Sequence, residues 1–203
     1  MQNIIFDMGN VLIRYAPEHF VEREGVADPA DRALLLENIF HSPDWPRLDW
    51  GELDEADLAA RALPKLPPRL HAAALRLIFA WEQPLEPIPG MADFVRSCKA
   101  RGCGVYLLSN ASHRQPTYWP RIPGSECFDG AVVSAFEGCV KPLPEFYIAL
   151  LTRYNLQAED CVFIDDLPRN VAGAEAVGMR GVLFDGDVDA LRRAVFGGDA
   201  AGA

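Results

Sequence analysis

The chain has 203 residues, of which 50% are hydrophobic, so it can form one large domain or a core domain that carries a smaller insert. Its formal net charge of -10 argues against nucleic acid and anionic membranes as general partners, because phosphate groups attract basic surfaces. No apolar stretch approaches the roughly 20 residues of a membrane span, and none near Met1 is as long as a signal-peptide core, so we expect a cytoplasmic protein.

The first predicted element is a strand over residues 3–7, NIIFD, which ends on Asp7. Gly9 and Asn10 follow before apolar residues resume. Taken alone, this ending is typical of a turn at the edge of a sheet. A carboxylate in that position is also suited to act as a nucleophile. Both interpretations of Asp7 are open at this point.

The stretch from 15 to 84 has helical patterns and no convincing strand. These patterns lie around 17–25, 31–40, 53–63 and 68–83, with prolines between them. A connection of roughly 70 residues is too long for a loop inside a compact domain. We therefore expect an inserted helical cap subdomain at 15–84, followed by a return linker.

The remainder alternates short apolar strands with helical patterns. Such alternation is typical of βαβ units in a doubly wound parallel sheet, whose strands are covered by helices on both faces. We therefore predict an α/β core domain at 1–14 and 85–196, and a disordered tail at 197–203. The later predicted strands are 103–110, 130–135, 161–166 and 181–186, and the predicted helices between them are 90–102, 142–156 and 167–179.

Polar side chains stand at the carboxyl ends of these strands. Asp7 ends the first, Ser109 and Asn110 end the second, and Asp165 and Asp166 end the fourth. Lys141 follows the third strand and directly precedes a predicted helix. Ligands of open α/β sheets bind beyond the carboxyl ends of the strands, where the strand order reverses. With the order 3-2-1-4-5, all of these residues would meet in one crevice.

The chemistry of such a crevice follows from its charges. Three carboxylates repel one another, so a hard cation such as Mg²⁺ is needed to keep them ionised. A cation together with Lys141 would bind a dianionic phosphoryl group, and Ser109 could donate to the same oxygens. Asp7 could then attack phosphorus and form an aspartyl-phosphate that water releases. Separately, each residue has an ordinary alternative: Asp165 and Asp166 as helix caps, Lys141 as a surface lysine.

Four motifs occur in a fixed order: FDxGNV, LLSN, a KP dipeptide and FIDDxxxNVxGAxxxGM. Together they resemble the haloacid dehalogenase-like hydrolase superfamily. The resemblance covers about residues 1–14 and 85–190. It is strongest to the branch with a small helical cap, which includes a bacterial α-D-glucose-1-phosphate phosphatase. The cap segment resembles that branch only in position, length and helical character.

The resemblance implies a role for each motif residue. Asp7 would be the nucleophile and a metal ligand, with the main-chain carbonyl of Gly9 and the side chain of Asp166 completing the Mg²⁺ site. Asp165 would hold a metal-bound water or Lys141. Asn170 would support the acidic pair from one helical turn away. Substrate would bind to Ser109, Asn110, Lys141 and Asn10.

Position 9 departs from the superfamily pattern. Its phosphatases usually carry a second Asp there, which protonates the leaving group and then activates water, a role worth typically ~10²–10⁴-fold in rate. Gly9 has no side chain to do this. Three interpretations follow: another group such as His113 or a metal-bound water takes over, the protein is a degenerate phosphate-binding phosphatase, or it is a dehalogenase in which Asp7 attacks carbon.

We expect a Mg²⁺-dependent hydrolase of a small, sugar-like phosphomonoester enclosed by the cap. Arg14 and the tryptophans at 45, 50, 81 and 119 are candidates for substrate contact, with surface or core positions as the alternative. Nothing in the sequence indicates an oligomeric state. The five cysteines are scattered and contain no CxxC pair, which favours reduced thiols over a zinc site or disulfides: Cys98, Cys103, Cys127, Cys139 and Cys161.

Overall fold

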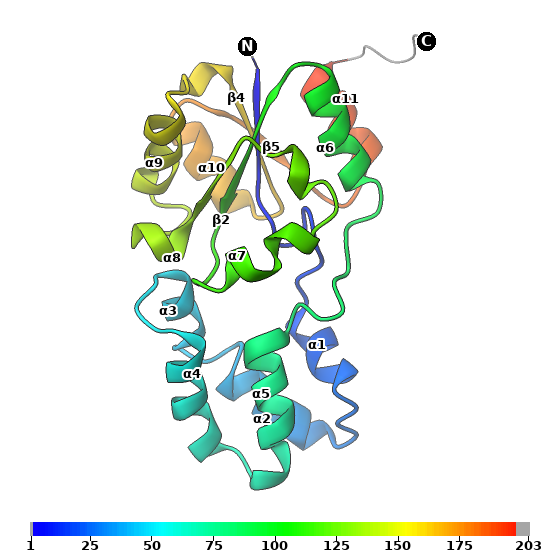
Figure 1. Ribbon diagram of the computed structural model, residues 1–203, viewed down its shortest axis with the longest axis vertical. Helices are drawn as coiled ribbons and strands as arrows, with labels where there is room; N and C mark the ends of the chain where they lie inside the picture. Colours follow the sequence, from blue (N-terminus) through cyan, green and yellow to red (C-terminus); the bar gives the residue numbers. More distant parts are fainter. Residues whose placement is uncertain (1, 198–203) are drawn as a thin grey trace.

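A five-stranded parallel sheet is the centre of the larger part of the molecule in the computed structural model, which describes residues 2–197 (Figure 1). The strand order is β3-β2-β1-β4-β5, which confirms the predicted order 3-2-1-4-5. The predicted tail, except Gly197, lies outside the described residues. The strands are β1 (Asn3–Phe6), β2 (Gly104–Ser109), β3 (Gly130–Val133), β4 (Cys161–Asp165) and β5 (Arg180–Leu183).

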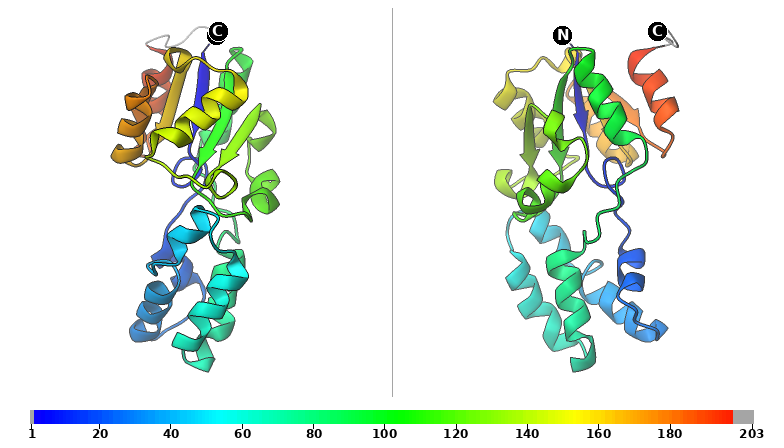
Figure 2. Two further views of the ribbon diagram at one scale, coloured as in Figure 1. Left: turned by 90° about the vertical axis from the view of Figure 1, so that its left-hand side faces the viewer. Right: turned by 45° about the vertical axis from the view of Figure 1, so that its right-hand side comes forward.

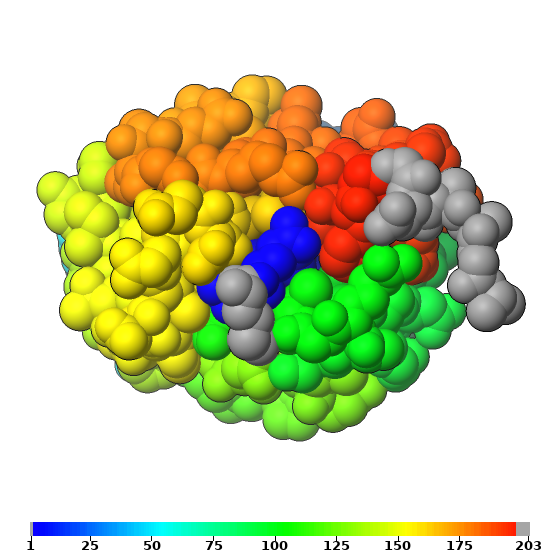
Figure 3. Space-filling model, turned by 90° about the horizontal axis from the view of Figure 1, so that it is seen from above, coloured from blue at the N-terminus to red at the C-terminus, as the bar shows by residue number. Residues whose placement is uncertain are grey.

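Helices cover both faces of the sheet, because alternate side chains of a strand point to opposite faces. Ile4 and Phe6 pack on the side of α6 (Met91–Ala100) and α11 (Val188–Phe196). Ile5 packs on the side of α9 (Pro144–Tyr154) and α10 (Pro168–Ala176). Viewed from above in Figure 3, β1 lies between these two pairs of helices. The fully buried β1 is therefore held from both sides, and its carboxyl end has a fixed position.

The predicted helices α6, α9 and α10 are confirmed to within a few residues. Helix α11 was not predicted, although Asp187 caps it by accepting a hydrogen bond from the backbone N–H of Ala190 at 2.9 Å. The expectation that every strand is buried on both faces is wrong for β5. Its residue Leu183 is exposed, because β5 is an edge strand with a neighbour on one side only.

Five helices between β1 and α6 form a second part with a hydrophobic cluster of its own. We call residues 15–82 the helical unit and the remainder the sheet unit. The helical unit lies beneath the carboxyl ends of the strands in Figures 1 and 2. Within residues 2–197, no helix combines the length and the apolar character of a membrane span. The helices of the unit are α1 (Pro17–Arg23), α2 (Pro29–Asn38), α3 (Trp45–Asp49), α4 (Glu55–Ala62) and α5 (His71–Ala80).

Helix α3 was not among the predicted helices. It has five residues and begins with a proline at its first turn, so it is too short to show a helical period in the sequence. Leu48 anchors it in the cluster of the helical unit, and the ring of Trp45 packs on Phe40 with centroids 4.5 Å apart. Asp49, the last residue of α3, lies at the end of the unit that meets the sheet unit.

The chain crosses between the two units at two adjacent places. The backbone N–H of Arg14 donates to the carbonyl of Glu86 at 2.8 Å, and that of Ile88 donates to the carbonyl of Leu12 at 2.9 Å. Ile13 and Pro87 form an antiparallel bridge between these bonds. The outgoing and returning segments are thus hydrogen bonded to each other.

Further contacts join the units away from these crossings. Ser112, in the loop after β2, donates to the carboxylate of Glu55 in α4. Arg114 from the same loop donates to Glu82, which is fully buried, at 2.6 Å. Gly51, just after α3, has φ +70°, and a Cβ added there would overlap the carbonyl oxygen of Ala135. The backbone of the two units therefore touches directly beside α3.

Replacing Gly51 by alanine should push α3 away from the sheet unit. The left-handed backbone alone disfavours an L side chain by roughly 1–2 kcal/mol. Gly25 supplies a matched control, since it has φ +71° and nothing within 4 Å of an added Cβ. We expect Gly51→Ala to lower the free energy of unfolding by more than Gly25→Ala does. Equal losses in denaturant titrations of both variants would contradict the contact.

Candidate active site

Three carboxylates come together where β1 and β4 end. The two strands pair in parallel, with Phe6 opposite Ile164, and the backbone N–H of Asp7 donates to the carbonyl of Ile164 at 2.9 Å. This register brings Asp7 beside Asp165 and Asp166. One carboxylate oxygen from each residue lies within 4.8 Å of the others. The predicted convergence of these residues is thus present in the structure.

Lys141 lies between two of these carboxylates. Its Nζ is 2.6 Å from Asp7 Oδ1 and 2.8 Å from Asp165 Oδ2, and its side chain is 1% exposed. Burial alone would lower the pKa of Lys141, but the charges of Asp7 and Asp165 hold it above its ordinary value. The ammonium group is therefore charged at neutral pH.

The Asp7 carboxyl is buried, which is unusual for an aspartate. Burial raises its pKa to about 7, and the charge of Lys141 opposes this rise. Asp7 is 8% exposed, and it lines the pocket described below. A buried carboxylate held against a lysine and open to a pocket is an arrangement that suits attack on a bound group.

Asp165 is fully buried, and both of its oxygens are engaged. Besides Lys141, it accepts hydrogen bonds from the backbone N–H of Leu167 at 2.9 Å and from Asn170 Nδ2 at 3.0 and 3.1 Å. Of the two tasks predicted for Asp165, the geometry matches the holding of Lys141. Asn170 Oδ1 is buried and has no hydrogen-bond partner among the described residues.

Asn110 and Asn10 orient other members of the site. The side-chain Oδ1 of Asn110 accepts from the backbone N–H of Lys141 at 2.9 Å, and its Nδ2 donates to the Lys141 carbonyl at 3.3 Å. Asn10, which has φ 54°, donates to Asp166 at 3.1 Å and accepts from the backbone N–H of Tyr15 at 2.9 Å. Both residues also line the pocket. Substrate binding by either remains a prediction.

Ser109 occupies the end of β2, but its side chain is buried and is absent from the lining of the pocket. Its Oγ lies 3.5 Å from the Asn110 carbonyl, at the long limit of a hydrogen bond. The phosphate contact of Ser109 therefore stays a prediction. Ser112, three residues further along, does line the pocket and was not singled out by the sequence.

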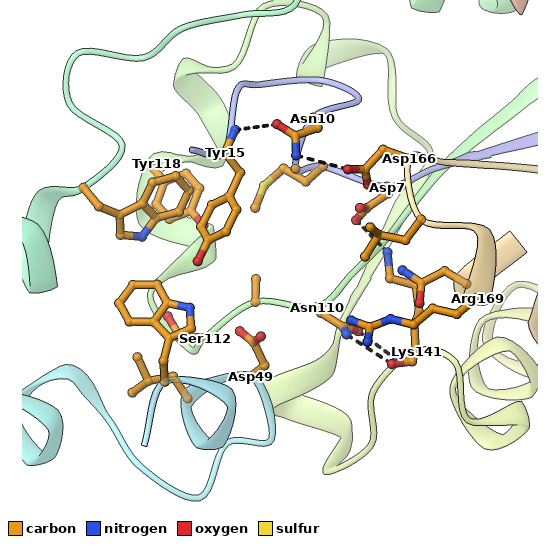
Figure 4. A pocket seen from close by; sticks show the side chains of 18 of the residues that line it. Asp7, Asn10, Tyr15, Asp49, Asn110, Ser112, Tyr118, Lys141, Asp166 and Arg169 are labelled. Atoms are coloured by element: carbon orange, nitrogen blue, oxygen red, sulfur yellow. Dashed lines mark hydrogen bonds and ion pairs between the residues drawn. The ribbon is translucent and has the colours of Figure 1, made fainter. Parts of the chain in front are cut away.

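A cavity of about 370 Å³ separates the acidic cluster from the helical unit (Figure 4). This volume is in the range of small-molecule sites. Gly9 and Asp166 line it on the side of the sheet unit. The opposite wall is largely aromatic, with ring centroids of Tyr15 and Trp81 5.3 Å apart and those of Trp81 and Tyr118 5.9 Å apart.

Sequence reasoning missed two acidic residues of this cavity, Glu55 in α4 and Asp49. Asp49 is half-buried and comes from α3 of the helical unit. Burial raises its pKa to about 7, with Lys141 lowering it and Asp7 raising it further. Arg169, near the start of α10, also lines the cavity and was missed. No local motif marks any of these residues, and only the fold brings them to the site.

The remaining candidates for substrate contact differ in whether they line the cavity. Trp45 and Trp81 line the cavity, whereas Trp50 and Trp119 do not. His113 is outside the lining, and its ring packs on Phe136 with centroids 4.8 Å apart. Arg14 is also outside the lining and pairs with Glu86 at 3.3 Å, with its side chain 48% exposed.

Comparison with known proteins gives consistent matches. A family model described as haloacid dehalogenase-like hydrolase matches residues 1–178. The sesquiterpene phosphatase astK of Aspergillus oryzae is 30% identical over 187 residues, which are 88% of this chain and 87% of the relative.

Two solved structures are similar in fold. A HAD-like family hydrolase from Porphyromonas gingivalis has a TM-score of 0.71 and 23% identity, with 97% of this chain and 98% of that chain covered. A HAD family enzyme from Bacteroides thetaiotaomicron, in complex with magnesium and inorganic phosphate, has a TM-score of 0.70 and 18% identity over 94% of this chain and 98% of that chain.

Proposed function

The chain belongs to the haloacid dehalogenase-like hydrolase family and is an enzyme of its phosphatase type, and on that basis we propose that it hydrolyses a small phosphomonoester through a phosphorylated Asp7. The observation that carries this proposal is the contact of Lys141 with Asp7 at 2.6 Å, between two residues that line the cavity. A nucleophilic carboxylate, a fixed cation and space for an organic group are the parts that such a reaction requires.

Each residue then has a definite task. A carboxylate oxygen of Asp7 attacks phosphorus, and Lys141 binds an oxygen of the phosphoryl group while offsetting the charge of Asp7. Asp165 and Asn110 position Lys141 through its side chain and its backbone. Asn10 holds Asp166 in place by donating to its carboxylate. The buried hydrogen bonds fix these groups before substrate arrives, which is what electrostatic stabilisation needs.

The residues at this site fit a Mg²⁺ ion. Three carboxylates lie close together against a single ammonium group, so the cluster favours additional positive charge. Oxygen donors are the ligands that Mg²⁺ prefers, and the free Oδ1 of buried Asn170 suits a water of a hydrated ion. Asp7, Asp166 and the carbonyl of Gly9 would hold the ion, with Asp165 beside them. When bound, Mg²⁺ neutralises charge on the phosphoryl oxygens.

The helical unit would act as the cap. We propose the division made from the sequence: a core domain of residues 1–14 and 85–196 and a cap of residues 15–84. Support comes from the separate hydrophobic clusters of the two parts and from the position of the cavity between them. A cap over the cavity would exclude water from the phosphoryl group and select the organic part of the substrate.

We consider two substrate classes for this cavity. The resemblance predicts a sugar phosphate, whose hydroxyl groups would find polar partners in Asp49 and Ser112. The aromatic wall favours a phosphorylated apolar alcohol, and the relative from Aspergillus oryzae is named as a sesquiterpene phosphatase. We propose the sugar phosphate as the first candidate and the apolar alcohol as the second.

A substrate panel with and without metal should separate the possible activities. We expect release of inorganic phosphate from small monoesters with Mg²⁺, and loss of that release when EDTA removes the metal. Assays would include sugar phosphates, isoprenoid monophosphates and haloacids, with phosphate and halide both measured. Halide release that survives EDTA would favour the dehalogenase alternative. Binding of phosphate esters without turnover across the panel would favour the degenerate phosphate-binding alternative.

We also propose a cytoplasmic location for the enzyme. All five cysteines are free thiols in the structure, which is the usual state of cysteine in reducing compartments.

A further inference from the structure

The proposed reaction needs a proton donor, and position 9 does not supply one. Departure of an alkoxide needs a proton, and Gly9, which follows the nucleophile by two residues, has no side chain to supply one. Building on the proposed function, we propose that Asp49 of the helical unit is the general acid of the first step and the general base of the second. The catalytic groups would then be divided between the two units.

The position of Asp49 suits this role. It is the last residue of α3 and lines the same cavity as Asp7 and Lys141. In Figure 4 its carboxylate points into the open space that separates the aromatic wall from Asp7. A phosphoryl group on Asp7 would have its leaving oxygen in that space, opposite the attacking carboxylate. The contact of Gly51 with the Ala135 carbonyl keeps the end of α3 close to the sheet unit.

The Asp49 carboxylate is also available for proton transfer. Among residues 2–197, no hydrogen bond or ion pair engages it, whereas the other acidic residues of the cavity have partners. Glu55 accepts from Ser112 and lies 3.7 Å from Arg114, and Asp166 accepts from Asn10. An unpartnered carboxylate aimed into a substrate cavity has its oxygens free for the substrate and for water.

The surroundings bring the titration of Asp49 close to neutral pH. Burial raises its pKa to about 7, Lys141 lowers it, and Asp7 raises it. The other titratable groups of the cavity wall are Tyr15, Tyr118, Glu55, Asp166 and Arg169. Burial raises the pKa of both tyrosines far above neutrality, so neither phenol exchanges a proton readily at pH 7. A group that serves as acid and base in turn works best with a pKa near the working pH.

The two steps balance because Asp49 gives one proton to the leaving oxygen in the first step and takes one from water in the second. In the first, Asp7 forms a bond to phosphorus, the bond to the leaving oxygen breaks, and that oxygen takes the proton of Asp49. In the second, Asp49 takes a proton from water as the water oxygen bonds to phosphorus. The bond between phosphorus and Asp7 then breaks, which returns Asp7 as a carboxylate and Asp49 as an acid. The sum is an alcohol and inorganic phosphate from an ester and water.

Asp49→Asn with two kinds of ester would test the proposal. The neutral amide keeps the shape of the side chain and cannot transfer the proton. We expect kcat/KM for an alkyl phosphate to fall by ~10²–10⁴-fold. With 4-nitrophenyl phosphate the first step should be nearly unchanged, because nitrophenolate leaves without a proton. A nitrophenolate burst equal to the enzyme concentration should follow, and then slow turnover, because the second step still needs the base.

Two variants serve as controls. Glu52→Gln removes a nearby carboxylate that pairs with Arg47 at 2.8 Å and is absent from the cavity lining, so both esters should be hydrolysed at the normal rate. Asp49→Glu keeps the acid and should restore part of the lost rate for the alkyl ester. In the unmodified enzyme, kcat/KM for the alkyl ester should show a descending limb at high pH, where Asp49 is ionised, and Asp49→Asn should lack that limb.

The outcomes separate this inference from the proposed function. Equal losses of kcat/KM for the two esters, or no loss for either, would overturn the assignment of Asp49 while leaving the phosphatase intact. If the unmodified enzyme released phosphate from no ester, the proposed function itself would fail. A selective loss for the alkyl ester together with the burst supports both.

Discussion

Asp7→Asn should abolish phosphate release, with kcat falling by about 10⁴-fold or more, the order of effect that loss of an attacking group has in enzymes with covalent intermediates. The amide that replaces the carboxylate is a poor nucleophile and removes one negative charge from the metal site. Lys141 would keep Asp165 as a partner at 2.8 Å, so the variant should remain folded. Phosphate release and thermal unfolding, measured on the same preparation, would check both expectations.

The matched control for this variant is Asp189→Asn. Asp189 is an exposed carboxylate in the first turn of α11, at a distance from the cavity lining. Its loss should leave the rate unchanged. A phosphorylated protein should also be detectable by mass spectrometry in acid-quenched reactions of the unmodified enzyme and be absent from Asp7→Asn. Phosphate release by Asp7→Asn at the normal rate would remove Asp7 from the role of nucleophile.

Lys141→Met should weaken both the fold and the reaction. It leaves Asp7 and Asp165 without their cation in a buried site, a change that typically costs about 3–5 kcal/mol in the free energy of unfolding. Loss of a fixed charge on the phosphoryl group should lower kcat by a further ~10²–10³-fold. Denaturant titration gives the first quantity, and steady-state kinetics at saturating Mg²⁺ gives the second.

The pH dependence of Lys141→Met has a definite sign. Without Lys141, the buried carboxyl of Asp7 binds its proton at a higher pH in the folded state than in the unfolded state, because burial raises its pKa. The loss of stability should therefore grow as the pH rises above about 4 and disappear below it. Lys99→Met is the matched control, because Lys99 pairs with Asp129 at 2.7 Å while 35% exposed. An exposed pair contributes about 0–1 kcal/mol, so equal losses in the two variants would contradict the buried ion pair.

The acidic cluster could be predicted because its residues stand directly at strand ends. Parallel strands that pair in register bring their carboxyl ends to one edge, so the order 3-2-1-4-5 was enough to bring Asp7 to Asp165 and Asp166. The hydrogen-bond partners of Asn110 and Asn10 could not be predicted from the strand order. Their bonds to Lys141 and Asp166 depend on the course of two loops, which the strand pattern leaves open.

The cavity wall opposite the cluster could not be predicted. Asp49 is about 40 residues along the chain from Asp7 and lies on a helix of five residues, which is too short to leave a periodic signal. Its approach to the site depends on how the helical unit packs on the sheet unit through Gly51, Glu55 and Glu82. Contacts of this kind join segments far apart in sequence, and no local pattern encodes them.

The paired crossings at Arg14–Glu86 and Leu12–Ile88 have a consequence for how such enzymes diversify. Because the outgoing and returning segments lie side by side, the helical unit is an insertion whose two ends are adjacent, the kind of segment that is replaced most easily without disturbing its host. The sheet unit would keep its own hydrophobic core through such an exchange. Asp49, however, belongs to the helical unit. A different inserted unit would therefore change the substrate preference, and it would either supply a general acid of its own or supply none. Substrate choice and proton transfer would then change together, while the phosphorylated Asp7 remains in the sheet unit.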